Sequence, residues 1–363
     1  MRTTGIVNSL GDAFRHTFLA MDGHAEALAA LRPDIRFRLA DPPASKDSLT
    51  CPFRMAAILR TLRPDLIVTY NWGAIDTVIA AQLTRLAPVI HTEDGFGADE
   101  AAGLKLRRVL TRRLLLNRIA ITVVISQRLL EIAQTHYKLR SGKVRFIANG
   151  VDTQKFRPGG DRRLRREWGV PEDSLLFGYI GRLGPEKNLP MLVRAFHRAA
   201  GGSSRLVLVG EGPMRPQIEA AIDAAGARSS IILAGPSKDP AGCLAAFDVL
   251  VMSSFTEQAS LALLEAMACG LPVVCTDAGD SRHMLAPAQS DFVVAVSDED
   301  AYVHALRRMA SDPDRRVRLG RENRERSVAL YSYSAMVEAY RELYRSTIDG
   351  FAQTRCATMN KSF

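Results

Sequence analysis

Long hydrophobic runs, paired cysteines and leader-like segments are scarce in this sequence of 363 residues. No run of about 18 uncharged apolar residues occurs, and the first residues lack an apolar stretch followed by a small-residue cleavage site. The five cysteines are odd in number, scattered and without a Cys-x-x-Cys pair, which is typical of reduced thiols. We therefore expect neither a membrane span nor an export signal, and a cytoplasmic location.

Basic residues are concentrated in the first part of the chain. Residues 1–155 hold 22 Lys and Arg against 14 Asp and Glu, whereas the remainder holds 26 against 25. Base-stacking aromatic residues do not alternate with these basic residues, and no nucleic-acid-binding motif occurs, so nucleic acid is not an expected partner. Anionic lipid head groups or an anionic acceptor fit better, and lipid would place the protein peripherally on the inner face of the membrane.

Short β-branched runs alternate with longer segments of helical period, which is typical of parallel βαβ layers. Because one hydrophobic core stops growing at roughly 250–300 residues, the length predicts two domains. Each half reads as a doubly wound α/β sheet. The expected strands are 5–7, 66–70, 89–91, 121–125 and 144–147 in the first half and 175–180, 205–209, 231–233, 249–252, 272–275 and 292–296 in the second, with helices at 189–200, 214–225, 261–268 and 301–310.

Residues 149–171 mix Gly, Pro and charge without a strand pattern, so we place the hinge there. The expected domains are 1–155 and 156–332, followed by a segment, 333–363, whose helix would return across the hinge to the first domain. Parallel sheets bind ligands beyond the carboxyl ends of their strands, so the residues after the strands are the candidates for chemistry.

Glu257 and Glu265 are separated by seven residues in the stretch SSFTEQASLALLEAMACGLPVV, residues 253–274. A helix that begins after Glu257 would direct free N–H groups at a phosphate, through Gln258, Ala259, Ser260 and Leu261. Glu265, inside that helix, could accept hydrogen bonds from two ribose hydroxyls. The alternative is a solvated helix carboxylate, but its apolar surroundings would make an unpartnered charge costly.

Arg182 and Lys187 follow another expected strand, in FGYIGRLGPEKNLP, residues 177–190. Two fixed cations there could bracket a diphosphate and stabilise the negative charge that grows on it as a sugar leaves. The alternative is a surface turn with solvated charges. The expected strands are not directly followed by an Asp-x-Asp metal motif, so we expect no divalent ion.

Glycine turns after other strands are weaker signals. Gly210 and Gly212, and the turn that ends at Ser237, could let a flat base approach the backbone closely. Gly11, after the first expected strand, could pass close to phosphate or sugar. The segment lacks a full G-x-G-x-x-G, so a dinucleotide site is poorly supported.

The ordered phrases GRLGPEKN, VGEGP, TEQASLALLEAMACGLPVV and TDAGD resemble the donor domain of family 4 retaining glycosyltransferases of GT-B fold. The resemblance covers residues 175–285 strongly and the first half loosely, through ANGVD at 148–152. It implies two Rossmann-like doubly wound parallel-sheet domains facing a central cleft. It further implies transfer from a UDP- or GDP-sugar to a glycan or lipid-linked acceptor in cell-surface polysaccharide or glycolipid synthesis.

The resemblance also implies residue roles. Arg182 and Lys187 would bind the donor diphosphate, Glu257 the sugar hydroxyls and Glu265 the ribose, without metal or other cofactor. Many relatives carry a sugar-facing His in a short phrase at the end of a first-half strand, and Asp94 stands in its place in HTEDG, residues 91–95. The role could fall to Asp94, Glu93 or His91, and the alignment favours Asp94.

Strand geometry bears on this choice. The period of two places His91 and Glu93 on one strand face and Asp94 on the other. A packed core histidine is the alternative for His91.

Two other functions compete. A nucleotide-sugar 2-epimerase shares the fold, but proton abstraction would require carboxylates and histidines that converge on the sugar. A non-catalytic nucleotide-sugar-binding scaffold is the other rival, because Asp94 replaces the usual His. The paired cations and paired glutamates favour transfer.

Residues 104–118 have the pattern of a basic amphipathic helix. Such a helix could lie among anionic head groups; the alternative is a surface helix packed by its leucines, with solvated arginines. Its apolar residues are Leu106, Val109, Leu110 and Leu114, and its basic residues are Lys105, Arg107, Arg108, Arg112 and Arg113.

Overall fold

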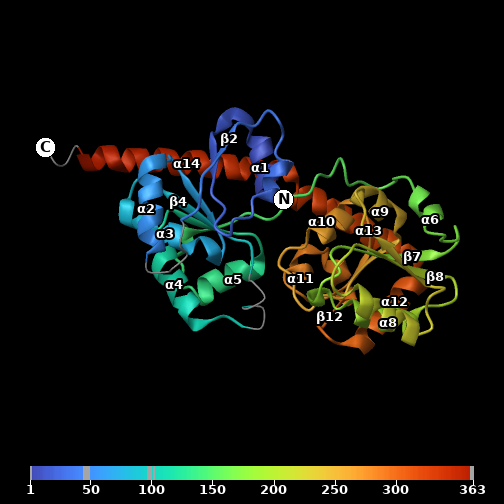
Figure 1. The fold of residues 1–363 in the computed structure, drawn as a ribbon. Helices are drawn as coiled ribbons and strands as arrows, with labels where there is room; N and C mark the ends of the chain where they lie inside the picture. The colour runs from blue at the N-terminus through green and yellow to red at the C-terminus, as the bar shows by residue number, and fades with distance from the viewer. Residues whose placement is uncertain (1, 44–49, 96–99, 101–102, 360–363) are drawn as a thin grey trace. The chain divides into compact units, whose positions relative to one another are not determined.

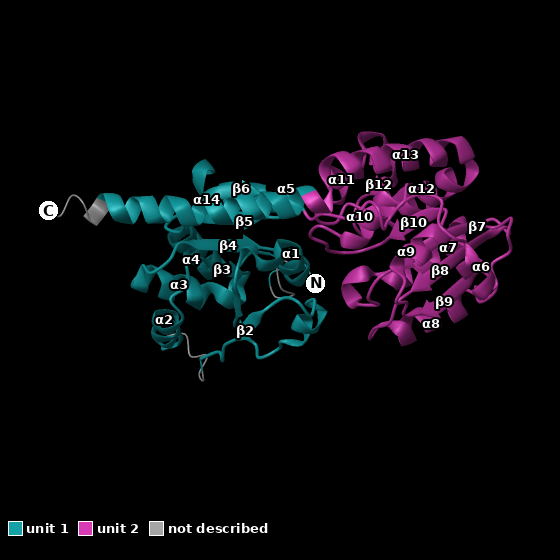
Figure 2. Ribbon diagram, turned by 90° about the horizontal axis from the view of Figure 1, so that it is seen from above, with its two compact units in different colours: residues 1–148, 335–363 teal, residues 149–334 magenta. Residues whose placement is uncertain are grey.

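The computed structural model describes residues 2–43, 50–95, 100 and 103–359, which form two compact α/β units (Figures 1 and 2). Unit 1 comprises residues 1–148 and 335–363, and unit 2 comprises residues 149–334. The units divide at 148/149, where the expected hinge begins.

Unit 2 is built on a six-stranded parallel sheet in the order β12-β11-β10-β7-β8-β9. The strands are β7 (Leu175–Ile180), β8 (Ser204–Val209), β9 (Ile231–Gly235), β10 (Val249–Met252), β11 (Val273–Thr276) and β12 (Val293–Val294). The helices are α6 (Arg163–Glu167), α7 (Leu189–Ala199), α8 (Arg215–Ala224), α9 (Pro240–Ala246), α10 (Leu261–Ala268), α11 (Ser281–Met284), α12 (Glu299–Ser311) and α13 (Pro313–Leu330).

Hydrophobic packing covers both faces of this sheet. Leu206 and Leu208 of β8 belong to one buried cluster, whereas Val207 and Val209 belong to the other. Because side chains alternate along a strand, a run of apolar residues supplies both cores. This explains why the strands of unit 2 appear in the sequence as continuous apolar runs.

Unit 1 holds a four-stranded parallel sheet in the order β3-β4-β5-β6, and a separate parallel pair, β1-β2. Its strands are β1 (His16–Phe18), β2 (Phe37–Leu39), β3 (Ile67–Tyr70), β4 (Val89–Glu93), β5 (Ile121–Val124) and β6 (Val144–Phe146), and its main helices are α1 (Arg2–Leu10), α2 (Cys51–Leu62), α3 (Ile75–Thr84), α4 (Leu106–Leu116) and α5 (Gln127–Thr135). Residues 335–359 of α14 (Tyr333–Met359) belong to unit 1, where Tyr344 packs on Phe14 with ring centroids 5.8 Å apart.

Most expected strands are confirmed, and the first and last differ. The expected strand at 5–7 is wrong, because these residues lie in α1, where Ile6, Val7 and Leu10 fall on one buried helical face. The expected strand at 292–296 shortens to β12, because a 3₁₀ turn that opens with Pro287 extends through Phe292. The sequence analysis also missed β1, β2 and α6. No helix among the described residues is long and apolar enough to cross a membrane.

Candidate active site

The strand order of unit 2 has a reversal point between β7 and β10. From β7 the chain proceeds outward through β8 and β9, and from β10 it proceeds the other way through β11 and β12. In sheets of this order ligands bind beyond the carboxyl ends of the two central strands. The loops that follow β7 and β10 carry Lys187 and Glu257, so both predicted site residues lie at the reversal point.

Lys187 and Glu257 form an ion pair across this point. Lys187 Nζ lies 2.5 Å from Glu257 Oε1, and the side chains are 20% and 11% exposed. Ser254 Oγ donates to the same carboxylate oxygen at 2.8 Å. The pair is therefore partly shielded from water but still reachable from solvent.

Backbone contacts fix the loop that carries Lys187. Ser253 Oγ donates to the carbonyls of Lys187 and Asn188 at 2.8 and 3.1 Å, and the N–H of Phe255 donates to the carbonyl of Glu186 at 2.8 Å. The loops after β7 and β10 are thus joined to each other.

Glycine in the TDAGD phrase allows a third loop to approach. A Cβ on Gly279, which has φ +61°, would lie 2.3 Å from the carbonyl oxygen of Glu257. The N–H of Asp280 donates to the carbonyl of Gln258 at 3.0 Å. Only glycine permits this contact, so the loop after β11 supports the backbone of Glu257 and Gln258.

The helix predicted to follow Glu257 is α10, and it begins as expected at Leu261. Ser260 is its N-cap, with Oγ accepting from the N–H of Leu263 at 3.3 Å. Gln258 and Ala259 are half-buried, and Asn149 Nδ2 donates to the carbonyl of Ala259 at 3.1 Å. Leu261 is exposed.

Glu265 is a half-buried carboxyl on α10. It has no hydrogen-bond or ion-pair partner among the residues that the structure describes. Burial raises the pKa of Glu265 to about 7, and the nearby charge of Lys155 offsets part of this shift. A carboxylate in such a place would gain from hydroxyl donors on a ligand.

Arg182 is the least engaged of the predicted residues. Its side chain is exposed and has no ion pair in the described part of the chain, while its carbonyl accepts from Tyr179 Oη at 2.8 Å. The structure therefore places Lys187 beside Glu257 and leaves the Arg182 guanidinium at the surface.

The predicted glycine turns have packing roles. A Cβ on Gly210 would lie 1.8 Å from the carbonyl oxygen of Gly181, and one on Gly212 would lie 2.5 Å from that of Leu183. These glycines allow the loop after β8 to pack against the loop after β7.

Two further residues of the glycine turns are placed differently. Ser237 is exposed, and its Oγ accepts from the N–H of Asp239 at 3.1 Å. Gly11 follows α1, not a strand, and opens a 3₁₀ turn, so the premise for its phosphate contact is wrong.

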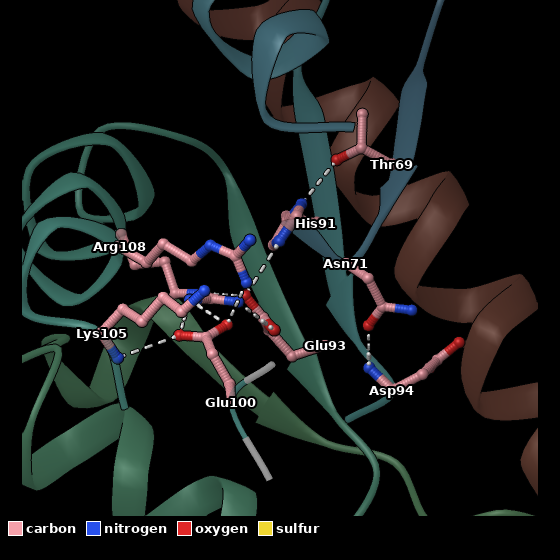
Figure 3. A network of polar contacts seen from close by, with 9 residues as sticks. Thr69, Asn71, His91, Glu93, Asp94, Glu100, Lys105 and Arg108 are labelled. Carbon is pink, nitrogen blue, oxygen red and sulfur yellow. Dashed lines mark hydrogen bonds and ion pairs between the residues drawn. The ribbon is translucent and has the colours of Figure 1, made fainter. Parts of the chain in front are cut away.

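Asp94, in unit 1, directly follows β4. Its side chain pairs with Arg2 and is 32% exposed. Its N–H donates to Asn71 Oδ1 at 2.7 Å (Figure 3). Burial raises the pKa of Asp94, and the Arg2 charge opposes that shift.

His91 and Glu93 lie inside unit 1. Thr69 Oγ1 lies 2.8 Å from His91 Nδ1, and His91 Nε2 lies 3.2 Å from Glu93 Oε1 (Figure 3). The predicted shared face of His91 and Glu93 is confirmed. Both side chains are essentially inaccessible, so the geometry favours a packed core histidine over a sugar-binding one.

Arg112 neutralises the buried carboxylates of unit 1. Its Nε and Nη2 donate to the two oxygens of Glu93 at 2.7 and 3.4 Å, and its Nη1 lies 3.5 Å from both oxygens of Glu100. Burial alone raises the pKa of Glu93, but His91 and Arg112 outweigh it and hold that pKa below its ordinary value. Arg112 also lies over the Trp72 ring.

Helix α4 contradicts the expected packing of its leucines and differs from the docking expectation at Arg108 and Arg112. Leu106, Leu110 and Leu114 are 72%, 53% and 55% exposed, so they do not pack on the sheet. Arg112, expected on the lipid-facing or solvated side, is buried, and Arg108 donates to Glu100 at 2.9 Å. The buried ion pairs explain the difference, because Glu93 and Glu100 require cations from this helix.

An Asp-x-Asp pair does occur shortly after β12, which the sequence analysis did not weigh. Asp298 caps α12 by accepting from the N–H of Ala301 at 2.9 Å, and Asp300 pairs with Arg198 at 2.6 Å. Within residues 2–43, 50–95, 100 and 103–359, no group of three or more His, Cys, Asp or Glu is arranged to hold a metal ion.

The sequence analysis did not identify the side chains that contact the predicted site residues. Ser254 stands three residues before Glu257, a spacing that could have suggested a local hydrogen bond. Asn71, directly after β3, has φ +55° and ψ −176°, and no sequence pattern announces this conformation. Arg112 was interpreted as lipid-facing or solvated, because its partners Glu93 and Glu100 lie in other segments.

Comparison with known proteins identifies the family. Residues 6–155 match the model of Glycosyltransferase Family 4, and residues 160–326 match that of Glycosyl transferases group 1. A GDP-mannose-dependent alpha-mannosyltransferase of Mycobacterium tuberculosis is 35% identical over 173 residues, 45% of this chain and 43% of the relative. Alpha-maltose-1-phosphate synthase of Mycolicibacterium smegmatis is 29% identical over 232 residues, 59% of this chain and 60% of the relative.

The chain thus spans about half the length of these curated relatives. Among solved structures, Anabaena HepE in complex with UDP superimposes with a TM-score of 0.80 over 95% of both chains at 18% identity, which shows the fold. The two family models together cover most of the sequence, from the first helix to the last turns of α13. The chain belongs to family 4 of the glycosyltransferases and has the GT-B fold.

Proposed function

We propose that the protein is a retaining glycosyltransferase that moves a sugar from a UDP- or GDP-sugar to a glycan or lipid-linked acceptor. The observation that carries the proposal is the Lys187–Glu257 pair at the reversal point of the unit 2 sheet. In a nucleotide sugar the diphosphate and the sugar are joined by one bond. A binding site for it therefore needs a cation and a hydroxyl acceptor side by side, as this pair supplies.

The chemistry follows from these charges. The bond between the anomeric carbon and the terminal phosphate oxygen breaks, and negative charge grows on the diphosphate. Lys187 and Arg182 stabilise that charge, and Glu257 holds the sugar hydroxyls. The acceptor oxygen bonds to the anomeric carbon on the same face, and its proton passes to the leaving phosphate. Glu265 accepts from the ribose.

Turnover of defined donors tests the proposal. Purified protein is incubated with UDP-glucose, UDP-N-acetylglucosamine, UDP-galactose and GDP-mannose, and release of nucleoside diphosphate is followed. We expect one donor to be consumed, with the sugar found on an acceptor or on water. Formation of a 2-epimer would favour the epimerase, and binding of every donor without turnover would favour a scaffold.

Metal independence has its own test. We expect EDTA to leave transfer intact, because fixed cations occupy the role that a divalent ion has elsewhere. Loss of activity with EDTA and its return with magnesium would overturn this point. Retention is read by NMR of the first-formed product, and a β product from an α-linked donor would remove it.

We further propose that α4 docks on an anionic membrane surface, which would bring the enzyme to a lipid-linked acceptor. Leu106, Leu110 and Leu114 recur every four residues and form an exposed leucine stripe. Beside it lies a depression of about 650 Å³. Exposed Arg113, Arg118, Lys138 and Arg140 line this depression, and exposed Arg107 follows Leu106 on α4. Each basic residue near an anionic leaflet contributes about 1 kcal/mol.

Vesicle sedimentation tests this docking. We expect binding to vesicles that contain phosphatidylglycerol at low salt, weaker binding as salt rises, and little binding to pure phosphatidylcholine. Changing the leucine stripe to serine, or Arg107, Arg113 and Arg118 to Gln, should release the protein. Leu83→Ser, an exposed leucine of α3, serves as the matched control. Equal sedimentation of all variants would remove the docking role of α4.

A further inference from the structure

We propose that Ser254 is a positioning residue for sugar transfer, because its hydroxyl orients the Glu257 carboxylate toward the donor sugar. The inference rests on the proposed function, in which Glu257 binds the sugar. It assigns a task to a buried serine that neither the sequence motif nor the family comparison singles out.

The geometry divides the two oxygens of Glu257 between two tasks. Ser254 Oγ donates to Oε1 at 2.8 Å, and Lys187 Nζ lies 2.5 Å from the same atom. Oε2 has no hydrogen-bond partner among the residues that the structure describes. An ionised carboxylate accepts about four hydrogen bonds. Oε2 is therefore the oxygen that remains for hydroxyl groups of a ligand.

The backbone on both sides of this contact is fixed. Thr276 Oγ1 donates to the carbonyl of Ser254 at 2.6 Å, and the carbonyl of Glu257 is covered by Gly279. The side chain of Ser254 is itself buried. Its hydroxyl is thus a donor at a fixed place, and rotation of the Glu257 carboxyl group would break the hydrogen bond.

Neighbouring Ser253 has the complementary contact, because its hydroxyl binds the carbonyls of Lys187 and Asn188. Two consecutive serines after β10 therefore fix both partners of the ion pair. Without the Ser254 hydroxyl, the carboxylate could turn both oxygens toward the Lys187 ammonium. The oxygen needed by the sugar would then be occupied.

The test compares binding of the nucleotide with turnover of the nucleotide sugar. For Ser254→Ala we expect kcat/KM for the donor to fall about 10- to 100-fold, the factor that corresponds to a hydrogen bond to a charged group. The Kd for nucleoside diphosphate alone should change much less, since Glu257 binds the sugar part of the donor and Lys187 keeps its charge in the variant. Ser254→Thr, which keeps the hydroxyl, should recover most of the loss.

Ser230→Ala is the matched control, because that hydroxyl donates to the carbonyl of Ala227 at 3.1 Å in the same unit. A double-mutant cycle completes the test. In a Glu257→Ala background, Ser254→Ala should add little, because a residue that acts through another has no effect once its partner is lost.

The outcomes separate the two proposals. If wild type turns over a donor and Ser254→Ala keeps its kcat/KM, or loses nucleoside diphosphate affinity equally, the positioning role is wrong. If wild type turns over no nucleotide sugar, the proposed function itself fails.

Discussion

The two units contain ion pairs of opposite character. In unit 1, Arg112 contacts both oxygens of Glu93 and both oxygens of Glu100, and all three side chains are almost inaccessible. In unit 2, Lys187 contacts one oxygen of Glu257, and water reaches both residues. The first arrangement leaves no atom for a ligand, and the second leaves one oxygen and an ammonium.

This difference distinguishes charged residues that only stabilise the fold from charged residues that can bind a substrate. A buried charge is tolerated when every polar atom has a partner, and removing one partner leaves the other buried charges uncompensated. A partly exposed pair with an unused acceptor contributes less to stability, and a substrate can bind to that acceptor. We therefore expect substitutions in unit 1 to affect unfolding first and those in unit 2 to affect turnover first.

The largest expected effect is that of Arg112→Ala. It leaves Glu93 and Glu100 buried without their cation, so we expect unit 1 to lose about 3–5 kcal/mol of stability. Trp72, beside Arg112, reports on unit 1 in a Trp168→Phe background, in denaturant unfolding followed by fluorescence. Arg113→Ala, an exposed arginine of the same helix, should change stability by less than about 0.5 kcal/mol. Equal losses of stability in Arg112→Ala and Arg113→Ala would contradict the structural role of the buried ion pairs in unit 1.

Lys187→Ala and Arg182→Ala should have the next largest effect, on turnover. Each removes a cation that faces the growing phosphate charge, so kcat should fall about 10²–10³-fold. For Arg182→Ala, unfolding of unit 2 should change little, because an exposed charge contributes little to stability. Lys187→Ala should also lower the stability of unit 2, because it leaves the mostly buried Glu257 without its cation. Arg228→Ala, exposed in the same unit, provides the control for removal of one positive charge. If either site variant kept its turnover, that residue would have no place at the diphosphate.

The sequence indicated the charged residues of unit 2 but not the buried cluster of charges in unit 1. The sequence predicted that Lys187 and Glu257 lie in loops after buried strands and Glu265 in the next helix, and the order of parallel strands brings the two loops together. The unit 1 cluster was not found, because Arg112 and Glu100 carry no motif and their burial depends on long-range packing. The strand expected at 5–7 failed because a three-residue apolar run fits a strand and a helix equally well.

The pH dependence of stability gives a further comparison of the two units, through Glu265 and Glu93. Burial raises the pKa of both Glu265 and Glu93, but only Glu93 has a cation that reverses the shift. Between its ordinary value near 4.5 and about 7, Glu265 is ionised in the unfolded chain but still protonated in the folded one. Stability from this group is therefore present at pH 4 and is lost as pH rises to 7.

Glu265→Gln should remove this loss. We expect the variant to match wild type at pH 4 and to be about 1 kcal/mol more stable at pH 8, a value reduced for solvent screening. Nucleoside diphosphate affinity should rise with pH through 7 in wild type, because ribose hydroxyls donate to the ionised form. The variant should show only the titration of the nucleotide itself. A wild-type stability that rises between pH 5 and 7 would contradict the assignment.

The smallest expected effect concerns Asn71. This residue of unit 1 bears on the position of Asp94 as well as on stability. Asn71 has φ +55° and ψ −176°, a conformation that only glycine adopts readily and that costs about 1–3 kcal/mol. Its Oδ1 accepts from the N–H of Asp94 at 2.7 Å, so the strained residue holds the backbone of the one predicted catalytic residue in this unit. Asn71→Gly relieves the strain and loses the hydrogen bond, whereas Asn71→Ala keeps the strain and loses the bond. We therefore expect the Ala variant to be less stable than the Gly variant by about 1 kcal/mol or more.

Turnover of the same variants tests whether the strained conformation of Asn71 contributes to catalysis. If the strained conformation serves to place Asp94, Asn71→Gly should keep its stability and still lower kcat, since the N–H of Asp94 then loses its side-chain acceptor. Arg85→Gly is the matched control, because Arg85 also has a positive φ, +51°, at the end of α3 and lies before β4, whereas Asp94 follows the carboxyl end of that strand. That variant should gain stability through the same relief of strain without a change in kcat. A Gly variant of Asn71 with full turnover would mean that unit 1 contributes no fixed side chain through this turn, and the catalytic groups would then lie in unit 2.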